Sequence, residues 1–286
     1  MKLKNLILNL CAIFLVSYSV NAQDVEGGLF LGAAQYQGDL SQNQITLSTT
    51  KPSFGALARY YFGPRIDVKG SLLYGWIGGN DQNYKNSTGT EEFRPGRNLN
   101  FTSHVLELSG QVEINILPFI SNTKKYRFAP YVFGGLAVYN FNPYATYSGT
   151  NYYLHQYQTE GVNYSTWQLA IPYGVGLKYS LGNFWNLGIE LGQRKLFTDY
   201  LDDVSKNYAS NLVAMYNSGN SKDVTGALLS AGIDPSTNTA ANHAFILHRL
   251  TELQGNGRGD SNKDDMYLFA GITITKTLRR FPCTNL

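Results

Sequence analysis

The stretch WNLGIELGQR, residues 185–194, alternates between two kinds of side chain from one position to the next. Trp185, Leu187, Ile189 and Leu191 are apolar, whereas the positions between and after them carry Asn, Gly, Glu, Gly and Arg. Successive side chains of a β-strand point to opposite faces. The stretch therefore predicts a strand with one apolar face and one face that carries charge in mid-strand.

The same alternation recurs along the chain. It is clean in residues 66–77, 99–115 and 166–180, and it is blurred in residues 27–37 and 126–141, where Gly and Ala occupy both parities. In total we predict eight strands rich in Tyr, Phe, Val, Leu, Ile and Gly. They span residues 27–37, 52–61, 66–77, 99–115, 126–141, 166–180, 184–198 and 266–277.

Length and composition indicate where such strands belong. Each segment supplies the roughly 9–11 residues that a tilted strand needs to cross a bilayer. The chain has 21 Tyr, 15 Phe and 29 Gly but only 15% charged residues, which is typical of membrane barrels with aromatic girdles. A net charge of +3 from scattered basic residues does not indicate a nucleic-acid partner. No motif predicts a cofactor.

Long and short connections alternate between the predicted strands. Residues 38–51, 78–98, 142–165 and 199–265 form long connections, and residues 62–65, 116–125 and 181–183 form short ones. Outer-membrane barrels have short periplasmic turns and long extracellular loops. The pattern predicts an up-and-down barrel of about eight strands in lipid, with both termini in the periplasm.

A soluble β-sandwich also alternates between apolar and polar positions. In that alternative the apolar parity would be the core and the charges would face water. The charges lie in mid-strand and Trp and Tyr lie near the strand ends, an arrangement that favours the membrane barrel.

The amino terminus has the layout of a secretory signal peptide, with Lys2 and Lys4 before an apolar run and a predicted cleavage after Ala22. We assign residues 1–22 to the signal, Cys11 included, and residues 23–286 to a single outer-membrane barrel domain. Cys283 is then the only cysteine of the mature chain, which excludes an internal disulfide and a cysteine metal site.

The polar parity of the predicted strands collects charges of both signs. An eight-stranded barrel is just wide enough for its interior to be filled by side chains, so we interpret these residues as a structural salt-bridge network in the lumen. A gated ion path is the functional alternative. The residues are Arg59, Lys69, Glu107, Glu113, Lys178, Glu190 and Arg194.

The long extracellular loop, residues 199–265, is the most unusual segment. Apolar spacing predicts helices at 207–216 and 242–253, and a loop of this length is expected to be a folded cap or a docking surface. Asp202, Asp203, Asp260 and Asp264 are weak candidates for calcium ligands. Their spacing does not match a known calcium loop, and helix capping and solvated turns are the favoured interpretation.

A lipid hydrolase is the enzymatic alternative, because Thr102 and His104 share the lipid-facing parity of their strand, with Ser103 on the other parity. No Gly-x-Ser-x-Gly elbow occurs, and no acid on that face would orient His104. We therefore predict that the protein is not an enzyme.

Several phrases together resemble a known family of outer-membrane barrels, the one that includes the type IX secretion component PorG. The resemblance covers nearly the whole mature chain. It rests on residues 32–40 (GAAQYQGDL), 60–65 (YYFGPR), 99–108 (LNFTSHVLEL), 129–135 (APYVFGG), 171–179 (IPYGVGLKY) and, most specifically, 199–205 (DYLDDVS).

The resemblance implies a secretion component that anchors a periplasmic ring lipoprotein to the outer membrane. No ring-contacting residue can be transferred from the family pattern. The alternative is a surface barrel for adhesion or ligand binding through the long loop.

Overall fold

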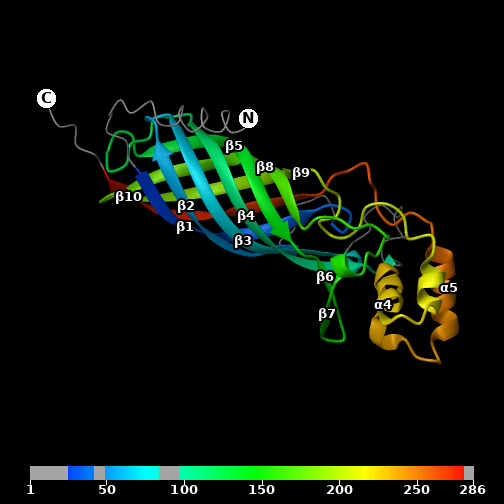
Figure 1. Ribbon diagram of the computed structural model, residues 1–286. Helices are drawn as coiled ribbons and strands as arrows, with labels where there is room; N and C mark the ends of the chain where they lie inside the picture. The colour runs from blue at the N-terminus through cyan, green and yellow to red at the C-terminus, as the bar shows by residue number, and fades with distance from the viewer. Residues whose placement is uncertain (1–24, 42–48, 84–96, 280–286) are drawn as a thin grey trace, which may run out of the picture.

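The computed structural model describes residues 25–41, 49–83 and 97–279. Within these residues eight long strands form one antiparallel sheet, and the pairings of the first strand with the last and of the third with the fourth close it into a barrel (Figure 1). The predicted fold class is thereby confirmed. The strands are β1 (Val25–Gln37), β2 (Lys51–Tyr61), β3 (Ile66–Asn80), β4 (Asn100–Asn115), β5 (Phe128–Phe141), β8 (Trp167–Gly182), β9 (Trp185–Leu196) and β10 (Met266–Arg279).

The barrel has two unlike ends. We call the end with the short connections, residues 62–65, 116–127 and 183–184, the turn end, and the opposite end the loop end. The β8–β9 connection is a two-residue turn in which Asn183 has φ 51° and Phe184 φ 66°. Positive φ at both central residues is the geometry that matches the twist of paired strands.

The outer wall of the barrel is apolar. Side chains such as Leu108, Leu136 and Leu169 project outward, and Leu136 is 71% exposed. Trp167 and Trp185 lie near opposite ends of this wall. A continuous apolar wall is stable in lipid and not in water, so the barrel is a transmembrane one.

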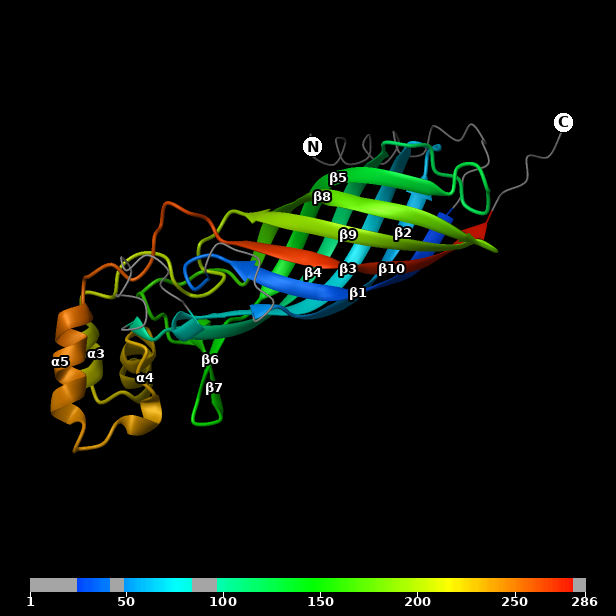
Figure 2. The same ribbon diagram turned by 180° about the vertical axis from the view of Figure 1, so that it is seen from behind.

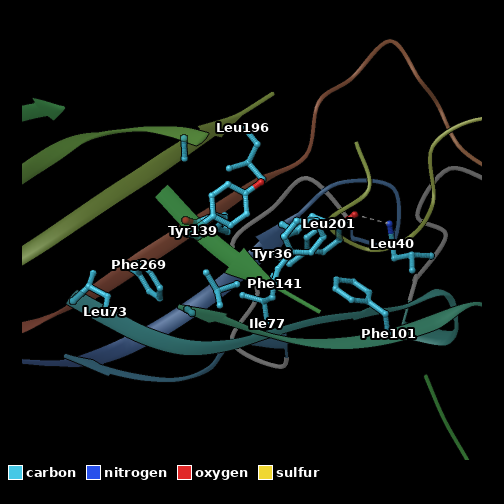
Figure 3. Packing of buried hydrophobic residues seen from close by; sticks show 14 of the residues in the cluster. Tyr36, Leu40, Leu73, Ile77, Phe101, Tyr139, Phe141, Leu196, Leu201 and Phe269 are labelled. Atoms are coloured by element: carbon cyan, nitrogen blue, oxygen red, sulfur yellow. Dashed lines mark hydrogen bonds between the residues drawn. The ribbon is translucent and has the colours of Figure 1, made fainter. Parts of the chain in front are cut away.

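The lumen is filled. Its loop-end half is packed with apolar and aromatic side chains, among them Tyr36, Ile77, Tyr139 and Phe141 (Figure 3). This packing explains why alternation in residues 27–37 is blurred: β1 places Phe30, Ala34 and Tyr36 inside the barrel and Leu29 and Leu31 outside, so both faces are partly apolar. At the turn end Phe119 is buried and stacks on Tyr61.

A hairpin and three helices stand beyond the loop end of the barrel (Figure 2). The hairpin consists of β6 (Tyr144–Tyr147) and β7 (Thr150–Tyr153). The helices are α3 (Leu212–Asn217), α4 (Ser221–Ser230) and α5 (His243–Leu253), with the short 3-10 helices η2 (Asp81–Asn83), η3 (Leu154–Gln156) and η4 (Pro235–Thr237) nearby.

The three helices, which we call the cap, enclose a small core of their own. Leu212, Leu228, Ile246 and Leu250 are fully buried in it. Ser148 at the hairpin tip donates a hydrogen bond to Asp234, which precedes η4, at 2.6 Å, so the hairpin and the cap are attached to each other. None of the described helices is long and apolar enough to span a membrane.

Most differences from the predicted elements lie at their ends. β3 extends to Asn80 and β9 stops at Leu196, and the expected helices correspond to α3 and α5. Neither α4 nor the β6–β7 hairpin was predicted. The predicted signal peptide, residues 1–22, and Cys283 lie outside the described residues.

Candidate functional site

The centre of the turn-end half of the lumen is a buried group of ion pairs around Glu113 of β4. Glu113 accepts from Arg59 Nε of β2 at 2.9 Å, and it lies 3.2 Å from Lys69 Nζ of β3 and 2.5 Å from Lys178 Nζ of β8. Three cations from three strands therefore share one carboxylate. Each residue lies on the inward parity of its strand, and the register of the paired strands brings them to one level of the barrel.

Further acids complete this layer. Arg59 Nη1 donates to Glu26 of β1 at 2.8 Å, and Lys69 Nζ donates to Glu190 of β9 at 2.5 Å. Asp67 of β3 is paired with Lys178. The layer thus contains four acidic and three basic side chains, all of them buried. Buried charges are tolerated when they are paired and hydrogen-bonded in this way.

A second ion pair lies nearer the loop end. Arg194 of β9 holds Glu107 of β4 with two hydrogen bonds, Nε at 2.9 Å and Nη2 at 3.1 Å. Tyr267 of β10 donates to the same carboxylate at 2.8 Å, and the Arg194 guanidinium lies 4.7 Å from the Phe269 ring centroid. Arg194 has no exposed surface.

The structure places all seven of the predicted lumen residues inside the barrel, in two groups. Arg59, Lys69, Glu113, Lys178 and Glu190 belong to the turn-end layer, and Glu107 and Arg194 form the separate pair. Sequence reasoning omitted two acids of the layer.

The two omissions have different causes. Asp67 lies on the polar parity of its strand and could have been included on that ground. Glu26 lies one residue before the predicted start of the first strand, so its parity was not considered.

The loop end contains a second set of buried polar groups, centred on Tyr36. Its hydroxyl lies within hydrogen-bonding distance of a carboxylate oxygen of Asp202 and, at 3.0 Å, of Asp265 Oδ1. The other oxygen of each carboxyl group accepts a backbone hydrogen bond. The Val204 N–H donates to Asp202 at 2.8 Å, and the Leu201 N–H donates to Asp265 at 2.9 Å.

A tyrosine hydroxyl has one proton and can donate to only one of these two carboxyl groups. The other carboxyl must keep a proton of its own to make a favourable contact. Burial, together with the charge of Asp39, raises the pKa of Asp202 well above its usual range, and burial with the charge of Asp202 does the same for the pKa of Asp265. The contact geometry and the raised pKa values together indicate that one of these two carboxyl groups is protonated.

An adjacent cluster joins two loops through Arg258. Its guanidinium lies 3.1 Å from Glu160 and 3.5 Å from Asp203. Asp203 also accepts from Tyr164 at 2.8 Å, and burial raises its pKa to about 6 in spite of Arg258. These contacts fasten the loop that follows β9 to the loop that follows β5.

The four candidate calcium ligands do not converge. Asp202 faces Tyr36, Asp203 faces Arg258, Asp260 is exposed and pairs with Lys263 at 3.3 Å, and Asp264 lines a different hollow. Across residues 25–41, 49–83 and 97–279 no group of three or more His, Cys, Asp or Glu side chains is arranged to hold a metal ion.

The residues weighed for catalysis have structural partners. His104 stacks on the Tyr74 ring at 6.2 Å, and Thr102 accepts from Lys51 Nζ at 3.2 Å. Ser103 is buried, donates to the carbonyl of His104 and accepts from the Asn142 N–H. The three side chains therefore do not form a nucleophile and base pair.

Fold and interior together define a class: a closed eight-stranded transmembrane β-barrel with a filled lumen and a structured cap. Within that class, the chain belongs to the family described as a domain of unknown function (DUF6089), whose sequence profile matches residues 4–230. Comparison with curated proteins gives no significant sequence match.

Several solved outer-membrane barrels are similar to the chain at low identity. Neisserial surface protein A has 7% identity and a TM-score of 0.39, with 90% of this chain and 98% of that chain covered. OprG from Pseudomonas aeruginosa has 9% identity and a TM-score of 0.36, with 90% and 97% covered. Ail of Yersinia pestis, in complex with the heparin analogue sucrose octasulfate, has 9% identity and a TM-score of 0.36, with 89% and 96% covered.

Proposed function

We propose that this protein is a non-enzymatic anchor in the bacterial outer membrane that serves type IX secretion by attaching the periplasmic ring lipoprotein to that membrane. In this arrangement the turn end and both termini face the periplasm, and the cap lies outside the cell. The observation that carries the proposal is the filled lumen. Because ion pairs fill the interior of the barrel, the lumen is not a transport path, and the surfaces at the two ends are left for binding partners.

Two further observations support this role. The sequence phrases at residues 60–65 and 199–205 resemble the family that includes PorG. The short turns are compatible with contact to a periplasmic partner close to the membrane surface.

Crosslinking in intact cells followed by purification of the barrel tests the proposal. The ring lipoprotein is expected to co-purify, and deletion of the gene is expected to stop export of type IX substrates. Normal export in the deletion strain would contradict the proposal, provided that the complemented strain behaves like the wild type.

A second candidate function is binding of a ligand or another cell by the cap. It is favoured by one observation, the independent core of the cap, because a folded surface element of this size is unusual for a mere connection. Replacement of residues 207–256 by a short Gly/Ser linker separates the two functions: export is retained if the turn end performs the role, and surface binding is lost if the cap does.

A further inference from the structure

Among the residues that the structure describes, the exposed charges at the turn end of the barrel are all basic. Within the described residues this end presents Arg65, Lys124, Lys125, Arg127 and Lys276 to the outside. Its acidic side chains, Glu26, Asp67, Glu113 and Glu190, are buried in the lumen and paired there. The described part of the rim therefore carries exposed charges of one sign.

Several of these cations lie against aromatic side chains of the outer wall. Lys276 Nζ is 5.3 Å from the Trp185 ring, and the Arg127 guanidinium is 5.3 Å from the Tyr179 ring. Trp and Tyr rings on a barrel wall lie at the level of the lipid headgroups. Lys276 also shares the outward parity of β10 with Ile274 and Leu278, so its ammonium must reach towards the headgroups from the lipid side.

An apolar groove of about 450 Å³ opens beside Arg65. Arg65 lies at the groove and is held there by a hydrogen bond from Nη1 to the Ile116 carbonyl at 2.7 Å. The other lining residues are Phe62, Gly63, Pro64, Ile66, Pro118, Ile120 and Tyr126.

We propose that the turn-end rim is a binding site for an anionic phospholipid, with the phosphate at Arg65 and its basic neighbours and part of an acyl chain in the groove. The cations beside wall aromatics, Arg127 and Lys276, put this rim at the level of the lipid headgroups, which favours a lipid over a protein docked on the turns. The choice of a phospholipid rests on the proposed orientation, in which this rim lies in the periplasmic leaflet.

The test uses the purified full chain in detergent, with phosphatidylglycerol and phosphatidylcholine competing for it in native mass spectrometry. The folded barrel is expected to retain phosphatidylglycerol preferentially. A cation near a membrane surface contributes enough that Arg65→Gln should weaken retention by about fivefold. Arg65→Lys, which keeps the charge, should bind normally.

Lys195→Gln is the matched control, because Lys195 is exposed on β9 near the opposite end of the barrel. Ile120→Trp should reduce retention by filling the groove without changing the charge. Heat-modifiable migration in electrophoresis confirms that each variant is folded. Equal retention of the two lipids, or an equal loss in Lys195→Gln, would overturn the proposal.

Two other outcomes would also overturn it. Preferential retention of lipid A would place the rim in the outer leaflet. Loss of crosslinking to a periplasmic protein in Arg65→Gln, with lipid retention unchanged, would make the rim a protein-binding surface. An epitope inserted at Asn238 reports the orientation separately, through antibody binding to intact cells. If the antibody binds but the barrel shows no lipid selectivity, the lipid-site proposal is wrong and the proposed orientation is retained.

Discussion

At the scale of single residues, the most consequential side chain is Glu113, because three cations depend on it. Removal of one partner from a buried ion-pair network leaves the others uncompensated. The identity of this residue as an inward-facing charge could be predicted from parity. Its central position could not, since the distances between Arg59, Lys69 and Lys178 depend on the register of four strands.

Glu113→Gln should therefore destabilise the barrel by about 3–5 kcal/mol. Urea unfolding in detergent, followed by tryptophan fluorescence, measures the change. Glu252→Gln, on the exposed surface of α5, is the control and should change stability by less than about 0.5 kcal/mol. A loss for Glu113→Gln no larger than that of the control would contradict the central role of Glu113.

The carboxyl groups of the loop base predict a dependence on pH. Burial, more than any other influence, raises the pKa of Asp199 to about 8 and that of Asp203 to about 6. As pH rises above about 4, the unfolded chain releases these protons while the folded loop retains them, so folding is progressively disfavoured. The loop after β9 should therefore be less stable at pH 8 than at pH 5.

Amide hydrogen exchange of residues 199–265 at several pH values, corrected for intrinsic rates, measures this trend. Asp202→Asn should weaken the dependence, because an amide can replace the protonated carboxyl beside Tyr36. The control is Asp260→Asn: the Asp260 side chain is 42% exposed, so this change should leave the pH dependence of protection unchanged. Protection that increases from pH 5 to pH 8 would contradict protonated carboxyl groups at the loop base.

At the scale of elements, all eight barrel strands were predictable, but only those that separate apolar from charged faces showed which side faces the lumen. β9 alternates cleanly because its inward face carries Glu190 and Arg194, whereas β1 has Phe30 and Tyr36 inside. Helix α4 escaped prediction because its run of Ser, Thr and Gly has little apolar periodicity. The Tyr36–Asp202 contact joins residues 166 positions apart, which no local pattern indicates.

The cap should unfold independently of the barrel. Leu250→Ala removes a fully buried side chain of α5 and is expected to cost about 2–5 kcal/mol within the cap. Limited proteolysis should then cut within residues 207–256 while the barrel keeps its heat-modifiable migration. Phe245→Ala, an exposed position in the same helix, is the control and should resist the protease like the wild type. If Leu250→Ala also lost the heat-modifiable migration of the barrel, the cap and the barrel would be coupled, which would contradict the prediction.

At the scale of the whole molecule, the two layers of buried ion pairs predict that the barrel does not conduct. Glu107 and Arg194 close the lumen above the Glu113 layer, and Phe119 lies below it. Planar bilayers containing the purified protein should show no steady, large conductance. Arg194→Ala removes the largest fully buried side chain and should raise the frequency of brief channel openings. Steady channels formed by the wild-type protein would contradict a plugged lumen.

The closure of the barrel also constrains how the protein is made. β1 pairs with β10 along its whole length, so the seam joins segments from opposite ends of the described chain. Contacts between segments so distant in sequence form slowly, and unpaired strand edges are exposed until they form. During biogenesis β1 must wait until β10 has been synthesised and delivered. A chain cut before Met266 would present two open edges, on β1 and β9, and would be a substrate for aggregation and proteases.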